Sequence, residues 1–365
     1  MFHHLSLAVV LPFLSACSEA KAPESSALLP DAGLVVTTVA ADYTVGALAM
    51  LDPDDRSLYD DLSSLSSDPG VSVDDGVVYQ VNRLGFDNVR VYQPGDWSVP
   101  ALEFSTGTGS NPQRVQRCLD RLFVALHDAA ALGIYDPETG VRLGEVPLGA
   151  YADADGIPEM GSLLEREGRL WLALQRLDRN NGWVSDTGMV VEIDCESETI
   201  LQDYVVGPSP TLAWDPGGTD ALLVRTGIYY DPDGAPLLDG GIFSMNLDSG
   251  DLTPLLTEAD YGQNLTGIAS TPDRDVVMVV SSDADAIYSV LCLDRATLSL
   301  RVAETTPSFI TASLISPTGE AWVATRPSWN DPEAPGVLRS YDPDSCAATG
   351  EPVRTTLPPY DLAWL

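Results

Sequence analysis

The chain has 365 residues, of which 44% are hydrophobic, so it can bury one large core or two to three ordinary ones. Its 54 acidic residues outnumber 19 basic ones, and the formal net charge of −35 at pH 7 would repel nucleic acid and anionic lipid headgroups. We therefore exclude nucleic acid and anionic membrane surfaces as partners. The excess acid is typical of a solvated surface, and a cation-binding surface is the alternative.

The amino terminus has the pattern of an export signal. Residues 5–14 (LSLAVVLPFL) form an apolar run too short to span a bilayer. The run ends in Leu14-Ser15-Ala16-Cys17, which resembles the bacterial lipobox, where the cysteine thiol receives a diacylglycerol. The region before it departs from that pattern because it has no Lys or Arg. An ordinary signal peptide with a chance cysteine is the alternative.

The resemblance to lipoproteins implies a location and a division of the chain. Ser18 follows Cys17 where an Asp would suggest inner-membrane retention, so the resemblance implies the outer membrane, on its periplasmic side or at the cell surface. Residues 18–33 (SEAKAPESSALLPDAG) are small, polar and Pro-containing, as in flexible tethers. We expect a signal peptide over 1–16, a lipidated tether over 17–33 and a folded domain over 34–365.

The folded domain contains a repeat. Seven apolar, strand-like runs each end in an acidic residue, once a glutamine, at a tight turn. Consecutive turn residues lie 41 to 58 positions apart, close to the roughly 40–50 residues of a four-stranded propeller blade. The sequence therefore predicts an all-β, seven-bladed β-propeller. The turn residues are Asp52, Gln93, Asp136, Asp194, Asp248, Asp294 and Asp342.

A second apolar strand precedes each turn residue, and a further strand precedes that one, except in the first repeat. There the tether leads directly into residues 34–39 (LVVTTV). The last residues, 360–365 (YDLAWL), match TLAW at 211–214. We therefore expect the C-terminal strand to become the inner strand of blade one and to close the ring, which removes exposed sheet edges.

Residues 135–149 (YDPETGVRLGEVPLG) resemble the YVTN-type propeller repeat, whose members carry a D-x-x-T-G/N turn between the third and fourth strands. The resemblance covers blade three well and the other blades in outline. It implies a propeller fold and says little about chemistry, because this fold has many functions.

Four cysteines remain once Cys17 is assigned to lipid, and an even count in an exported protein predicts two disulfides. Three connectivities exist. The expected blade positions favour Cys118–Cys195 and Cys292–Cys346, each joining neighbouring blades. Free, buried cysteines are the alternative.

No catalytic motif is found, so we predict no enzyme. His127 is the only histidine after the signal region, and we expect it on the second strand of blade three as a structural residue. No Gly-x-Ser-x-Gly elbow, P-loop or dinucleotide fingerprint occurs.

Two acidic loops are candidates for calcium, and no other cofactor is expected. Asp153 and Asp155, and likewise Asp231 and Asp233, precede a glycine as in half an EF-hand loop, without the glutamate that completes one. Ordinary turn chemistry is the alternative.

Loop lengths point to one face of the ring. Loops that follow the second and fourth strands of a blade share a face, and only there do we expect long ones, at 149–161, 176–188, 226–241 and 326–336. We predict that these loops bind a ligand. Lids packed onto the blades are the alternative. The candidate ligand-binding residues are Tyr151, Arg179, Trp183, Tyr229, Tyr230, Arg326 and Trp329.

We therefore expect a monomeric outer-membrane lipoprotein, which touches the membrane through its lipid alone. Its propeller is predicted to be a non-catalytic binding or scaffolding module for a protein or an envelope polymer. The first alternative is a hydrolase that resembles calcium-dependent propeller lactonases. The second is a purely structural surface protein.

Overall fold

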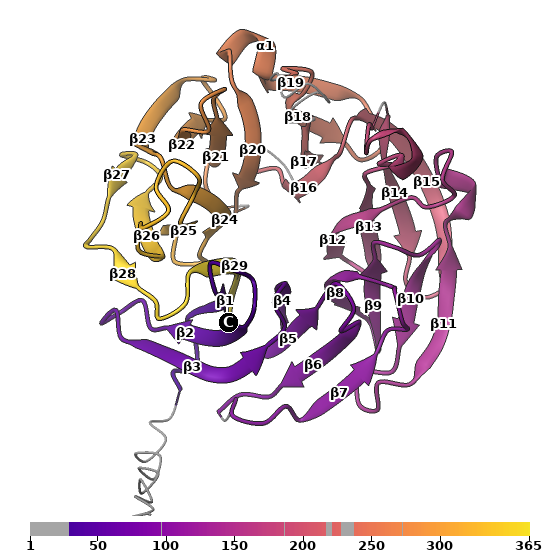
Figure 1. Ribbon diagram of the computed structural model, residues 1–365. Coiled ribbons are helices and arrows are strands. Elements are labelled where there is room, and N and C mark those ends of the chain that lie inside the picture. The colour runs from indigo at the N-terminus through magenta and orange to yellow at the C-terminus, as the bar shows by residue number, and fades with distance from the viewer. Residues whose placement is uncertain (1–28, 96, 186, 217–220, 228–236, 272) are drawn as a thin grey trace, which may run out of the picture.

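The computed structural model describes residues 29–365 except 96, 186, 217–220, 228–236 and 272. Seven small antiparallel sheets are arranged in a ring, so the described chain is a seven-bladed β-propeller, as predicted (Figure 1). The predicted signal peptide, Cys17 and most of the tether lie outside the described residues. No helix in the described part of the chain is long and apolar enough to cross a membrane.

The blades follow one another around the ring. Within each blade, the strands are ordered from the inner position, at the centre of the ring, to the outer position. The first three blades, in this order, are built from β29 (Pro359–Trp364), β1 (Leu34–Val39), β2 (Gly46–Leu51), β3 (Leu58–Leu65); β4 (Pro69–Asp74), β5 (Val77–Asn82), β6 (Asn88–Tyr92), β7 (Leu102–Ser105); and β8 (Pro112–Cys118), β9 (Arg121–Leu126), β10 (Ala131–Tyr135), β11 (Arg142–Pro147).

The remaining four blades have the same order, and the outer edge of the last is divided between two short strands. They are built from β12 (Met160–Arg166), β13 (Arg169–Leu174), β14 (Gly188–Asp194), β15 (Thr199–Gly207); β16 (Thr211–Trp214), β17 (Ala221–Thr226), β18 (Gly241–Asn246), β19 (Leu252–Thr257); β20 (Asn264–Ala269), β21 (Val276–Ser282), β22 (Tyr288–Asp294), β23 (Leu300–Thr306); and β24 (Phe309–Ile315), β25 (Ala321–Arg326), β26 (Val337–Asp342), β27 (Ala347–Ala348) with β28 (Val353–Arg354).

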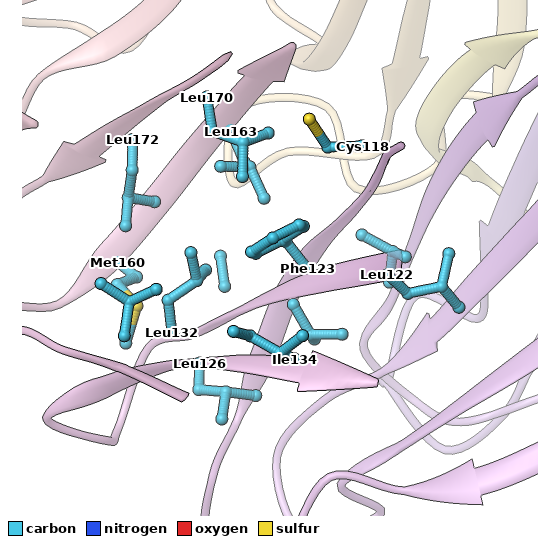
Figure 2. Close-up of a cluster of buried hydrophobic side chains, with 14 of the residues drawn as sticks. Cys118, Leu122, Phe123, Leu126, Leu132, Ile134, Met160, Leu163, Leu170 and Leu172 are labelled. Carbon is cyan, nitrogen blue, oxygen red and sulfur yellow. The ribbon is translucent and has the colours of Figure 1, made fainter. Parts of the chain in front are cut away.

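The core lies between neighbouring blades. Second strands such as β9 (RLFVAL) are apolar on both faces, because each face packs against another blade, and five of its six residues are buried. Figure 2 shows one such layer, in which Phe123 and Ile134 of blade three face Leu163 and Leu172 of blade four.

The two ends of the chain meet in blade one. β29 pairs with β1, Leu34 opposite Trp364 and Val36 opposite Leu362, and Leu365 N donates a hydrogen bond to Gly33 O at 2.8 Å. The predicted ring closure is confirmed.

The repeated acidic residues shape the turns after the third strands. Asp136 Oδ1 accepts hydrogen bonds from the backbone N–H of Glu138 at 3.1 Å and Thr139 at 2.8 Å. In blade five the sequence prediction is wrong by two positions: Asn246, at the end of β18, accepts from the N–H of Asp248 at 3.0 Å. Asn and Asp make the same turn, so the short side chain matters there and its charge does not.

The predicted cysteine pairing is also confirmed. Cys118 bonds to Cys195, with Cα atoms 6.1 Å apart, and Cys292 bonds to Cys346, with Cα atoms 5.9 Å apart. Each disulfide joins two neighbouring blades on the face opposite the long loops.

Candidate functional site

The loops that follow the second and fourth strands share one face of the ring, which we name the long-loop face. Two pockets formed by described residues open on it. One lies over blades one, six and seven and the other over blades three and four, on different sides of the ring (Figure 1). We name them the Arg326 pocket and the Arg179 pocket.

The Arg326 pocket has a volume of about 440 Å³ and collects aromatic side chains from three blades. Tyr288 and Phe309 form an edge-to-face pair with centroids 5.2 Å apart. Trp329, in the loop between β25 and β26, is 97% exposed. The lining residues are Ala41, Tyr43, Ala286, Tyr288, Phe309, Arg326, Pro327, Ser328, Trp329 and Pro332.

Arg326 is the charged residue of this pocket, and it is only 3% exposed. Arg326 is the last residue of β25, and all six residues of this strand are buried. Its guanidinium carbon lies 4.4 Å from the Tyr43 ring centroid and 5.5 Å from that of Tyr360. Nη2 donates to Ala40 O at 3.3 Å. The buried Nη1 makes no hydrogen bond, and no carboxylate pairs with Arg326 among the residues that the structure describes.

The loop that carries Trp329 is tied down on both sides. Ser328 Oγ donates to Pro307 O, and Asn330 Nδ2 donates to Asp285 O at 2.5 Å. Trp329 therefore stands exposed on a braced loop, which is unlike a lid packed onto a blade.

The Arg179 pocket has a volume of about 370 Å³, and its charged lining residues are Asp153, Arg176 and Asp178. A charged network around Arg179 lies next to this lining in the chain. Arg179 Nε lies 3.2 Å from Glu159 Oε1 and 3.7 Å from Asp155 Oδ2, and Nη2 donates to Asp128. The guanidinium carbon also lies 5.1 Å from the ring centroid of Trp183, which is 52% exposed. Arg179 is thus neutralised by acids, whereas Arg326 is not.

Three carboxylates meet beside Arg179. Ligand oxygens of Asp153, Asp155 and Glu159 all lie within 4.8 Å of one another. Burial raises the pKa of Glu159 to about 7, and burial also raises the pKa of Asp153. Burial acts in the same direction on Asp155, but N–H donors from Ile157 and Arg179 hold the pKa of that carboxyl below its ordinary value.

Carboxylate oxygens are the ligands that calcium prefers, so the donor set suits the predicted metal. The Arg179 guanidinium already lies against two of the three carboxylates and would have to move for a cation to share them. Asp231 and Asp233, the other predicted calcium ligands, lie outside the described residues, and so do Tyr229 and Tyr230.

The other predicted site residues fall into two separate groups. Arg326 and Trp329 line one pocket, and Arg179 and Trp183 flank the other. Tyr151 lies in a 3₁₀ turn, where it packs half-buried against the core between blades three and four, as a lid would.

His127 departs from its predicted place on a strand. It lies one residue beyond β9, in the turn on the long-loop face, where Nδ1 is 2.7 Å from Asp128 Oδ1. Its partner Asp128 also binds Arg179, so the imidazole belongs to the network of the Arg179 pocket.

Sequence reasoning missed Tyr43, Tyr288, Phe309 and Glu159. Tyr43 follows the second strand of blade one, so the rule that selected the long loops could have found it. The sequence did not indicate Glu159 as a site residue, because its spacing from Asp153 matches no calcium-binding loop.

The comparisons with known proteins define the fold. No family model and no curated protein matches the chain. Two similar solved structures are putative 6-phosphogluconolactonases, from Bacteroides fragilis (12% identity, 92% of this chain and 98% of that one, TM-score 0.63) and Bacteroides uniformis (11%, 92% and 100%, 0.62). Hydrazine synthase from Kuenenia stuttgartiensis is also similar (13%, 88% and 95%, 0.50). At these identities the likeness establishes a β-propeller and no activity.

Proposed function

We propose that this protein is an outer-membrane lipoprotein whose propeller is a non-catalytic binding module for a protein or an envelope polymer. The observation that carries the proposal is the Arg326 pocket, where an almost fully exposed tryptophan stands beside a buried arginine. Trp, Tyr and Arg are the residues that most often dominate binding energy at interfaces. Folding gains little from a large aromatic side chain that is exposed on a braced loop, so contact with a partner explains this side chain better.

Binding of the purified protein to fractionated peptidoglycan and to periplasmic protein tests this proposal. We expect one fraction to bind, and we expect Trp329→Ala to weaken that binding at least tenfold. Trp183→Ala is the matched control, since Trp183 is also an exposed tryptophan of the same face but lies beside Arg179 and not beside Arg326. If no fraction binds, the structural-protein alternative replaces the proposal.

The lipid anchor is a separate part of the proposal and rests on Leu14–Cys17. Cells that express the wild-type chain should incorporate labelled palmitate into the protein, and Cys17→Ser should abolish the incorporation. Fractionation of the labelled protein with the outer membrane supports the location, and recovery in the inner membrane contradicts it.

A hydrolase of the lactonase-like kind is the second candidate. Its support is the group of three carboxylates at Asp153, Asp155 and Glu159, which could share a calcium ion. Lactone hydrolysis that requires calcium, stops with chelator and is lost in Glu159→Gln would establish this function in place of the first.

A further inference from the structure

We propose that the Arg326 pocket binds a single carboxylate group attached to an apolar or aromatic body. This inference rests on the proposed function and names the chemistry of its ligand. A buried guanidinium with an unbonded N–H, and with no counter-ion among the residues that the structure describes, is an unfavourable arrangement unless a ligand completes it. A carboxylate is the group that fits a guanidinium best, through charge-assisted and often paired hydrogen bonds.

Two other arginines of the ring, Arg295 and Arg114, have their counter-ion in the protein, and the buried Arg225 donates instead to Leu265 O, Ser209 O and Thr211 Oγ1. Arg295 Nε lies 3.0 Å from Asp215 Oδ1, and Arg114 binds both oxygens of Asp361. Arg326 has instead two tyrosine rings and one carbonyl oxygen. Its charge is therefore left for a ligand.

The walls of the pocket define the body that carries the carboxylate. Tyr288, Phe309 and Trp329 offer ring faces and edges, and Ala286 and Pro332 add apolar surface. A volume of about 440 Å³ is within the range of small-molecule sites and holds one side chain or one small acid. The C-terminal residue of a peptide and a free aromatic acid both have this chemistry.

The charge of the whole protein argues against an acidic polymer in this pocket. A net charge of −35 repels a chain of many carboxylates. A single carboxylate at Arg326 lies well within the screening length of about 8 Å, so salt weakens its attraction to the guanidinium without abolishing it.

Access to Arg326 depends on Tyr43, whose ring covers the guanidinium. Tyr43 is 48% exposed, and its φ of 56° places it in a tight turn that Asp42 stabilises through Thr44. A ligand carboxylate would displace this ring and take over its side of the guanidinium. Tyr43→Ala should therefore leave binding of the acid intact or strengthen it.

Calorimetric titration of the purified protein with N-acetyl-L-phenylalanine and with its uncharged carboxamide tests the inference. The two probes share one apolar body, so we expect the acid to bind at least tenfold more tightly, with an affinity that falls as sodium chloride is added. Arg326→Gln should reduce the preference to less than twofold. Arg90→Gln, at an exposed pair with Glu103 on blade two, is the control and should keep the preference.

A tetrapeptide that ends in phenylalanine, with a free or an amidated C-terminus, separates the two sources of the carboxylate. Tighter binding of the free peptide than of N-acetyl-L-phenylalanine identifies a peptide terminus, and the reverse identifies a small acid. If Arg326→Gln does not fold, Arg326→Lys should retain a salt-sensitive preference for the acid.

Equal affinity for acid and amide, or an acid preference that survives Arg326→Gln, would overturn the inference. Binding of an envelope fraction that depends on Trp329 while neither acid binds would refute the carboxylate and leave the binding module standing. Failure of both experiments would refute both.

Discussion

Asp361 lies opposite Thr37 in blade one, 324 positions away in the chain, and its backbone N–H donates a hydrogen bond to Thr37 Oγ1 at 3.1 Å. The Asp361 carboxylate extends the contact beyond this blade. It accepts from Val71 N of blade two at 3.0 Å and binds the Arg114 guanidinium of blade three. One C-terminal side chain thus connects blade one, where the ring closes, with blades two and three.

Asp361→Ala should therefore destabilise the fold by about 2 kcal/mol, because it leaves the Arg114 charge and the Val71 N–H without their partner. Urea unfolding measures the change. Asp344→Ala is the control: it removes an exposed carboxylate that pairs with Arg274 and should cost less than about 1 kcal/mol. Equal effects of the two variants would contradict this account of ring closure.

Truncation of Trp322 should cost far more stability than truncation of Trp329. Trp322 is fully buried, so Trp322→Ala should lower the free energy of unfolding by about 3–5 kcal/mol. Trp329 is 97% exposed, so Trp329→Ala should change it by less than about 0.5 kcal/mol. Thermal unfolding of both variants gives the comparison. A large loss of stability in Trp329→Ala would mean that this side chain acts as a lid.

Each disulfide closes a long loop, of 77 residues for Cys118–Cys195 and 54 for Cys292–Cys346. The chain-entropy model gives each about 4 kcal/mol of stability. Replacing both cysteines of one pair by serine should lower the melting temperature clearly, and a reductant should lower that of the wild type further. A thiol assay on the denatured, unreduced wild type should find no free thiol among these four cysteines; two or more would contradict the pairing.

Glu159 predicts a pH dependence. Its folded pKa of about 7 lies above the ordinary value of 4.5, so the folded state binds more protons between these pH values than the unfolded state does. The stability that the neutral carboxyl contributes is therefore complete below pH 4.5 and is lost as the pH rises through 7. Glu159→Gln should match the wild type near pH 4.5 and be the more stable protein at pH 8. Melting temperatures of both across this range test the sign, and parallel curves would contradict it.

The fold was readable from the sequence because each blade repeats a local pattern. A buried run such as residues 122–126 and an Asx turn such as that at Asp136 depend on neighbours in the chain, and these neighbours recur. Ring closure and the cysteine pairs followed from counting strands. The error at Asp248 arose because Asn246 makes the same turn, which a search for acids overlooks.

The pockets were less readable because they join residues from different blades. The sequence identified Arg326 and Trp329 from one loop, but Tyr43 and Phe309 reach the same pocket from blade one and from the start of blade seven. The sequence does not distinguish Arg326 from Arg179, because both are arginines in long loops that also contain aromatic residues. The structure distinguishes them by their neighbours: carboxylates surround Arg179, and aromatic rings surround Arg326.

Hydrogen exchange of the full protein, with and without the envelope fraction that it binds, tests the central claim that the long-loop face is the binding surface. The account predicts slower exchange in residues 282–288 and 326–337, which border the Arg326 pocket, and unchanged exchange in the opposite-face turns at 136–141 and 294–299. Protection of the opposite-face turns, with none around Arg326, would contradict it.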